Sequence, residues 1–154
     1  MEKQFVVFQI AQEHYGVDIS GVREILRLPE ITRMPSLPEF VEGIINPRGT
    51  VIPVIDLHTR FGLPERENTN ATRVMVLNVG KSLVGAVVDS VSEVLSISED
   101  EIERVDMFSV RVSSEYITGV AKLENRLVIL LDYEKVLSDG EQEEVMDLVD
   151  AAAG

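Results

Sequence analysis

Residues 39–57, EFVEGIINPRGTVIPVIDL, return in altered form at residues 115–133 as EYITGVAKLENRLVILLDY. An earlier segment repeats in the same way, because residues 5–26 align without a gap with residues 74–95. The offset between the copies is 69 residues in the earlier pair and 76 in the later pair, since the second copy has a longer middle. Repeats of this kind indicate two units of one architecture. We therefore expect a duplicated protein.

Both copies consist of short runs rich in Val, Ile and Leu that are bounded by Gly, Asn, Asp and Ser. Such runs at close spacing are typical of small β-barrels and sandwiches. Between two of these runs, Asn46, Pro47 and Gly49 suit a type I turn, which predicts a hairpin. The pattern predicts an all-β protein of two small barrels, at approximately residues 14–68 and 72–138.

The remaining segments connect or complete these barrels. The N-terminal strand, residues 4–11, could pair with either barrel. Residues 62–72, GLPERENTNAT, are polar and contain Pro and Asn, so they predict a loop between the copies. A capping-box pattern at residues 98–101, SEDE, predicts a short helix. Residues 139–154 predict a C-terminal helix or tail. The apolar face of this helix would consist of Val145, Leu148 and Val149.

The composition argues against several classes of protein. The 154-residue chain carries 27 Asp and Glu against 14 Lys and Arg, a formal charge of -13. Such a surface repels nucleic-acid phosphates and anionic lipid. The absence of cysteine excludes disulfides and thiolate metal sites and is compatible with the cytoplasm. No apolar run approaches the roughly 18 residues of a spanning helix, so no membrane insertion is expected.

The titratable residues do not suggest an active site. Neither His14 nor His58 has a second histidine or a cysteine nearby to complete a ligand pair. Asp56 and Asp132 stand at equivalent strand ends in the two copies, which favours a shared structural role such as turn capping. The chain contains no phosphate-binding glycine loop and no nucleophile elbow. We predict no catalytic residues, no metal ligands and no cofactor.

Positions at which the copies differ are candidates for binding. Arg48 corresponds to Glu124, which reverses the charge, and Pro53 corresponds to Ile129. A proline cannot donate to a β-ladder, so an open or irregular sheet edge is expected at Pro53 where the second copy is regularly paired. Arg48 is either a solvated turn charge or an anchor at a protein interface.

Residues 18–26, DISGVREIL, allow two interpretations. Val22 and Ile25 either pack in the core or form an exposed apolar patch beside Glu24. The pattern does not separate the two.

Four segments together resemble the CheW family of chemotaxis coupling proteins: residues 15–25, 43–57, 115–120 and 127–132. The resemblance extends from Phe5 to about Leu137, with the motifs in the same order. It implies a single CheW-like domain over residues 1–154, built of two SH3-like five-stranded β-barrels. It also implies a non-catalytic adaptor that joins the cytoplasmic tips of chemoreceptors to the histidine kinase CheA. The location implied is the cytoplasm, at receptor arrays on the inner face of the membrane.

The resemblance also assigns residues to two binding sites. The receptor site, in a groove between the barrels, would contain Val22, Glu24, Gly43, Arg48 and Val94. The kinase site would contain Ile19, Val22 and Ile25. Pro47 stands where Leu is common in the family; it stiffens the turn and should not remove the contact made by Arg48.

Two other functions remain open. One is a barrel that binds a small molecule, or an enzyme with a site between the copies, which would need convergent polar groups in a deep pocket. The other is a scaffold module that binds only the kinase. It would show no receptor-dependent change in kinase activity.

Overall fold

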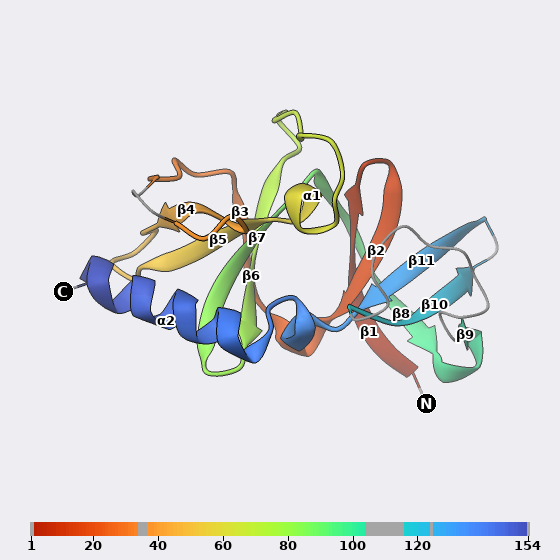
Figure 1. The fold of residues 1–154 in the computed structure, drawn as a ribbon. Helices are drawn as coiled ribbons and strands as arrows, with labels where there is room; N and C mark the ends of the chain where they lie inside the picture. The colour runs from red at the N-terminus through yellow and green to blue at the C-terminus, as the bar shows by residue number, and fades with distance from the viewer. Residues whose placement is uncertain (1, 34–36, 104–115, 124, 154) are drawn as a thin grey trace.

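The computed structural model describes residues 2–33, 37–103, 116–123 and 125–153, most of which lie in two β-sheets (Figure 1). One sheet has six strands in the order β8–β1–β2–β11–β10–β9, and the other has five in the order β3–β6–β7–β5–β4. The six-stranded sheet contains β1 (Glu2–Ile10), β2 (Glu13–Asp18), β8 (Ser90–Ser98), β9 (Ile102–Glu103), β10 (Ile117–Leu123) and β11 (Arg126–Leu131). The five-stranded sheet contains β3 (Val22–Arg27), β4 (Val41–Ile45), β5 (Ile52–Asp56), β6 (Arg73–Val79) and β7 (Ser82–Val88).

The helical segments are short except for the last. In the described ranges they are η1 (Ile19–Gly21), α1 (Leu57–Arg60), η2 (Glu99–Glu101), η4 (Tyr133–Lys135) and α2 (Asp139–Ala153). The predictions of an all-β protein with a C-terminal helix and of a capped turn at Ser98 are confirmed. One sheet has six strands rather than five because β9 adds to β10. Among the described residues, no pairing closes either sheet into a complete barrel.

Each sheet combines strands from both copies of the repeat. In the alignment, β1, β2, β3, β4 and β5 correspond to β6, β7, β8, β10 and β11. The leading hairpin of each copy joins the later strands of the other copy, so, apart from the additional β9, the two sheets have the same strand order under this correspondence. The irregularities match as well, because the bulge where Val7 and Phe8 meet β8 recurs where Val22 and Glu24 meet β6.

The sheets therefore do not follow the expected division at residues 68–72. Strand β2 joins β8–β11, and strands β6 and β7 join β3–β5. The connections explain this exchange. Asp89 alone separates β7 from β8, and the shortest common hairpin loop has about two residues, so β8 continues into the other sheet. The N-terminal strand, which could have paired with either barrel, is β1 and lies between β8 and β2 in the six-stranded sheet.

The expectation of a sheet edge at Pro53 is wrong, because β5 lies between β7 and β4. The proline still shortens a ladder. Parallel pairing of β5 with β7 begins at Val54, whereas the equivalent ladder of β11 with β2 includes Ile129 and begins at Val128. The missing N–H is the physical reason.

The inner strands of the sheets are buried on both faces, which explains their near-continuous apolar runs. Along β1, Val6, Phe8 and Ile10 face the large core between the two sheets, whereas Phe5 and Val7 face a smaller core within the six-stranded sheet. The five-stranded sheet encloses a separate core of its own. Alternation along each strand thus supplies two cores at once.

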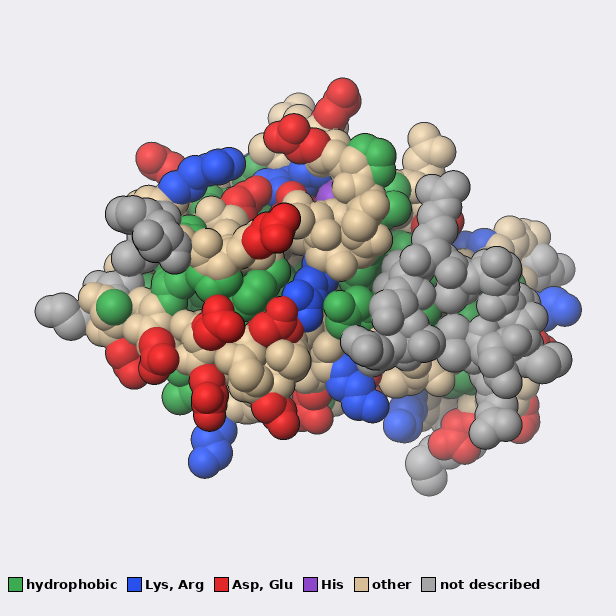
Figure 2. Space-filling view, viewed as in Figure 1, with side chains coloured by type: hydrophobic (Ala, Val, Ile, Leu, Met, Phe, Trp, Pro, Cys, Tyr) green, Lys and Arg blue, Asp and Glu red, His purple; other side chains and the backbone are tan. Residues whose placement is uncertain are grey.

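Helix α2 runs beside the five-stranded sheet (Figure 1). Its predicted face is correct, since Val145 is fully buried and Leu148 packs against the central core. Acidic side chains of the helix line the face of the molecule seen in Figure 2, consistent with the strongly negative charge. In the described residues, no helix is long and apolar enough to cross a membrane.

Candidate functional site

Arg48 and Glu24 form an exposed ion pair between two elements of the five-stranded sheet. The predicted hairpin is present, with Arg48 in the loop between β4 and β5 and Gly49 at φ +86°. The Arg48 side chain is 65% exposed and donates to Glu24 Oε1 on β3, whose side chain is 25% exposed. Since β3 and β4 are opposite end strands, this contact requires the sheet to curl. The structure therefore brings two of the predicted receptor residues together.

An equivalent ion pair stands on the six-stranded sheet. Glu93, which corresponds to Glu24, accepts from Arg126 of β11. Arg126 does not correspond to Arg48, whose counterpart Glu124 lies outside the described residues. Both copies thus pair the glutamate of the third strand with an arginine from a hairpin, but they take the arginine from different positions.

Gly43 is buried and has a packing role. A Cβ atom at this position would lie 2.4 Å from the carbonyl oxygen of Thr32 and 2.7 Å from Ile31 Cγ2. At Gly119, its counterpart, a Cβ atom would lie 2.7 Å from Ile102 Cγ2 and 2.9 Å from the carbonyl oxygen of Glu103. The shared glycine is explained by this close approach of the next segment of chain.

The predicted apolar residues differ in exposure. Ile19 and Ile25 are 39% and 40% exposed, and Val94 is 51% exposed. Val22 instead packs against the core between the sheets. Of the two interpretations of residues 18–26, core packing fits Val22 and an exposed patch fits Ile25. Val94 corresponds to Ile25 and lies on the end strand of the other sheet.

The aspartates at the strand ends have the predicted structural role. Asp56 caps α1 by accepting from the backbone N–H of His58 at 3.0 Å, and Asp132 accepts from that of Glu134 at 3.0 Å.

His58 is buried, with Nε2 2.8 Å from Asp89 Oδ1, and its Nδ1 donates to the carbonyl oxygen of a neighbouring loop proline. Asp89 also accepts from the backbone N–H of Ala11 at 2.8 Å. These bonds join the two sheets.

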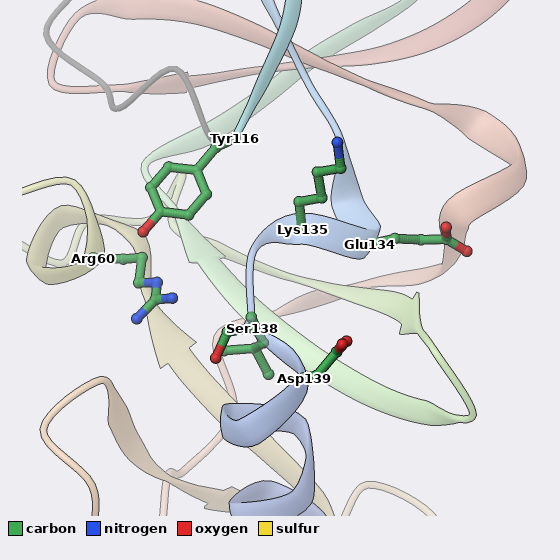
Figure 3. Close-up of a pocket in the computed structure, with 7 residues that line it drawn as sticks. Arg60, Tyr116, Glu134, Lys135, Ser138 and Asp139 are labelled. Carbon is green, nitrogen blue, oxygen red and sulfur yellow. The ribbon is translucent and has the colours of Figure 1, made fainter.

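Arg60 lies where the two copies and α2 meet, and sequence reasoning missed it (Figure 3). Its guanidinium lies 5.4 Å from the Phe40 ring centroid and 5.5 Å from that of Tyr116, within cation–π range. Nε donates to the carbonyl oxygen of Val136 at 3.0 Å, and Nη1 donates to Glu141 Oε2 at 2.7 Å. The repeat contained a signal for this site, because both copies have an aromatic residue at the equivalent positions Phe40 and Tyr116.

Glu141 stabilises the N-terminus of α2 through hydrogen bonds to Ser138. Its side chain accepts from the backbone N–H of Ser138, and its own N–H donates to the Ser138 hydroxyl, forming a capping box. Burial alone would raise the pKa of Glu141, but the bonds from Arg60 and Ser138 outweigh it and lower the pKa below the ordinary value. The carboxylate is therefore held in its charged form.

The cavity beside Arg60 does not provide a convergent polar site. It has a volume of about 270 Å³ and is also lined by Tyr116, Glu134 and Lys135. In Figure 3 the ends of Glu134 and Lys135 point away from the guanidinium of Arg60, which Glu141 already engages. None of the predicted receptor or kinase residues lines this cavity. The geometry does not favour a small-molecule site there.

Arg66 is a second residue that sequence reasoning missed, because it lies in the expected loop. Its side chain is only 7% exposed and forms ion pairs with Glu42 and Asp56, each at 2.7 Å. Burial would lower the pKa of Arg66, but the hydrogen bond to Glu42 and the charge of Asp56 raise it overall. The linker is therefore anchored to β4 and to the cap of α1.

Within the described part of the chain, no group of three or more potential ligands could hold a metal ion.

Comparisons with known proteins agree with this arrangement. The family model described as CheW-like domain matches residues 4–141. The Klebsiella aerogenes protein named chemotaxis protein CheW is 40% identical over 98% of this chain and 89% of its own length. The Treponema pallidum protein of the same name is 34% identical over 94% of this chain and 88% of its own length. A solved structure, the scaffolding protein TtCheW from Thermoanaerobacter tengcongensis, is similar with a TM-score of 0.82 and 37% identity, covering 91% of each chain.

Proposed function

Since the chain belongs to the CheW-like domain family, we propose that it couples the cytoplasmic tips of chemoreceptors to the histidine kinase CheA. It is a chemotaxis scaffold protein, in keeping with its named relatives and with the similar scaffolding protein. We further propose that it acts in the cytoplasm at receptor arrays and catalyses no reaction of its own.

The observation that carries the proposal is the pair of exposed apolar residues at equivalent places on the two sheets. Ile25 and Val94 lie on the two end strands β3 and β8, and each follows a glutamate bound by an arginine. An adaptor needs two separate surfaces of this kind. Apolar contacts flanked by arginine are typical of binding hot spots.

The receptor site is proposed to use Val22, Glu24, Gly43, Arg48 and Val94. The Arg48–Glu24 pair is exposed enough to meet a partner, and Gly43 would act through the backbone by letting β4 pack closely. The kinase site is proposed to use Ile19, Val22 and Ile25, of which Ile19 and Ile25 offer exposed apolar surface.

Reconstitution tests the proposal. CheA activity would be measured with and without a receptor cytoplasmic fragment, in the presence and absence of this protein. Receptor-dependent change in kinase activity only when this protein is present is the expected result. Binding to the kinase without any effect of the receptor would favour the kinase-only scaffold. Absence of binding to either partner would overturn the proposal.

A further inference from the structure

Strands β3 and β8 are the same strand of the repeat in two different sheets. Each pairs with a single neighbour among the described strands, β3 with β6 and β8 with β1. Each carries an exposed apolar residue at the same place, Ile25 and Val94. End strands of this kind accept partners along the unpaired edge. The duplication therefore provides two edges at equivalent places in the two sheets, and their residues can be compared position by position.

The two edges differ in charge. Strand β3 carries Arg23 and Arg27, and its neighbour β6 begins with Arg73. The three equivalent positions in the other sheet hold Ser92, Ser96 and Gln4. The first edge therefore has three positive charges that the second lacks. Positions that the copies share serve the common fold, so a difference confined to one edge points to a role of that edge alone.

The three arginines are not used for internal ion pairs. Arg27 and Arg73 are register partners, so two like charges face each other, which destabilises a sheet. Arg23 and Arg27 are exposed, and within the described residues neither forms an ion pair, although the chain has 27 carboxylates. Among the residues that the structure describes, Arg73 donates only to backbone carbonyl groups of the preceding loop.

The one carboxylate on this strand does not neutralise them. Glu24 already accepts from Arg48, which lies on the loop between β4 and β5. Three guanidinium groups thus remain around Ile25 on a protein whose overall charge is -13. A local charge of the opposite sign to the rest of the surface attracts and orients an acidic partner.

We propose that the β3 edge binds an acidic segment of the kinase, with carboxylates facing Arg23, Arg27 and Arg73 and an apolar side chain against Ile25. This inference rests on the kinase binding proposed above and adds the chemistry of the partner. The same segment would bind poorly to the β8 edge, where uncharged side chains replace the arginines. Charge would then keep partners from exchanging between the two equivalent edges.

A triple substitution tests the inference with little risk to the fold. Arg23→Ser, Arg27→Ser and Arg73→Gln place on the β3 edge the residues that the equivalent edge already accommodates. The matched control removes three exposed positive charges elsewhere, through Lys81→Ser, Lys122→Ser and Lys135→Ser. Binding of each full-length chain to purified CheA would be measured by calorimetry at low and high salt.

The arginine variant is expected to bind CheA about tenfold more weakly at low salt, as lost exposed ion pairs would produce. The difference should shrink at about 0.5 M salt, because screening weakens exposed charges. The lysine variant should stay within about twofold of the wild type. Equal losses in the two variants would overturn the inference, since net charge alone would explain them.

A further variant separates this inference from the proposed function. If Ile25→Lys abolishes binding while the arginine variant binds like the wild type, β3 contacts the kinase but the arginines do not recognise it. That result overturns the inference and leaves the proposed function intact. A wild-type chain that does not bind CheA overturns both.

Discussion

Arg48 projects from the loop between β4 and β5 and donates to Glu24 while most of its side chain stays in solvent. Exposed ion pairs contribute only about 0–1 kcal/mol to stability. The pair is therefore better suited to orienting a side chain for a partner than to holding the fold. The reversed charge at the equivalent position of the second copy agrees with a role of the first copy alone.

Arg48→Ala should weaken receptor binding by roughly 2 kcal/mol, the cost of truncating an interface hot spot. The melting temperature should change little, because the side chain is 65% exposed. A pull-down with purified kinase and receptor fragments measures the effect, and Lys122→Ala, at an exposed position of β10, is the control. Unchanged receptor affinity would remove Arg48 from the site.

Ile19 precedes β3 in the short turn η1, and its side chain is 39% exposed. Ile19→Lys should impair kinase binding while leaving receptor binding and the melting temperature near those of the wild type. Its exposure explains why the fold should tolerate the change, since a lysine there keeps its charge in water. A large loss of thermal stability would show instead that Ile19 belongs to the core.

At the scale of elements, the space around Gly43 and Gly140 shows why β4 requires glycine at position 43. Gly43 lies beneath the backbone of Thr32, whereas nothing lies within 4 Å of a Cβ built on Gly140 of α2. Gly43→Ala should destabilise the protein by about 1–3 kcal/mol, the usual cost of overpacking. Gly140→Ala should be neutral or stabilising by up to about 1 kcal/mol. Urea unfolding compares them, and equal stability would contradict the packing role.

Helix α2 is held at its first turn by Glu141, whose pKa is lowered in the folded protein, mainly by Arg60. A lowered folded pKa means that protonation favours the unfolded state. The stabilisation is complete above the unfolded value of about 4.5 and is lost as the pH falls through the folded pKa.

Glu141→Gln should therefore lower the free energy of unfolding at pH 7, because it leaves Arg60 without its charged partner. As the pH falls below 4.5 and through the folded pKa, the difference in stability between the variant and the wild type should shrink and then disappear. Urea unfolding at a series of pH values from neutral to acidic measures this. A constant difference across the whole series would show that the carboxylate charge does not matter.

At the scale of the whole molecule, the two copies are bound together by exchange of their leading hairpins. The six-stranded sheet needs β1 and β2 from the first copy and β8–β11 from the second. The largest apolar core lies between the sheets and contains residues from both copies. Neither half can complete a sheet or cover that core without the other.

Cutting the chain within residues 62–72 should give two fragments that do not melt cooperatively on their own. Each fragment would lack strands of both sheets, so its cores would be exposed to water. Mixing the fragments should restore a cooperative transition and the circular dichroism of the intact chain. A fragment that melts alone at the temperature of the intact protein would contradict the exchange.

Much of the fold could be predicted from local pattern. The repeat, the hairpin at residues 46–49, the caps at Asp56, Ser98 and Asp132, and the apolar face of α2 depend on nearby residues, and the structure contains them all. The repeat and the strand pattern predicted the two-part β architecture, and resemblance to the family supplied the SH3-like barrel type and the function class.

Which strands pair was decided only by the tertiary structure. A strand alternates its side chains in the same way whichever sheet it joins, so β2 and β7 look equally suited to either sheet. Long-range contacts likewise gave Arg60 and Arg66 their partners and separated Val22, which packs against the core, from the exposed Ile25. The sequence by itself determined the repeated units and their turns, because these depend on neighbouring residues. The exchange between units and the surfaces it leaves exposed required the three-dimensional packing of the whole chain.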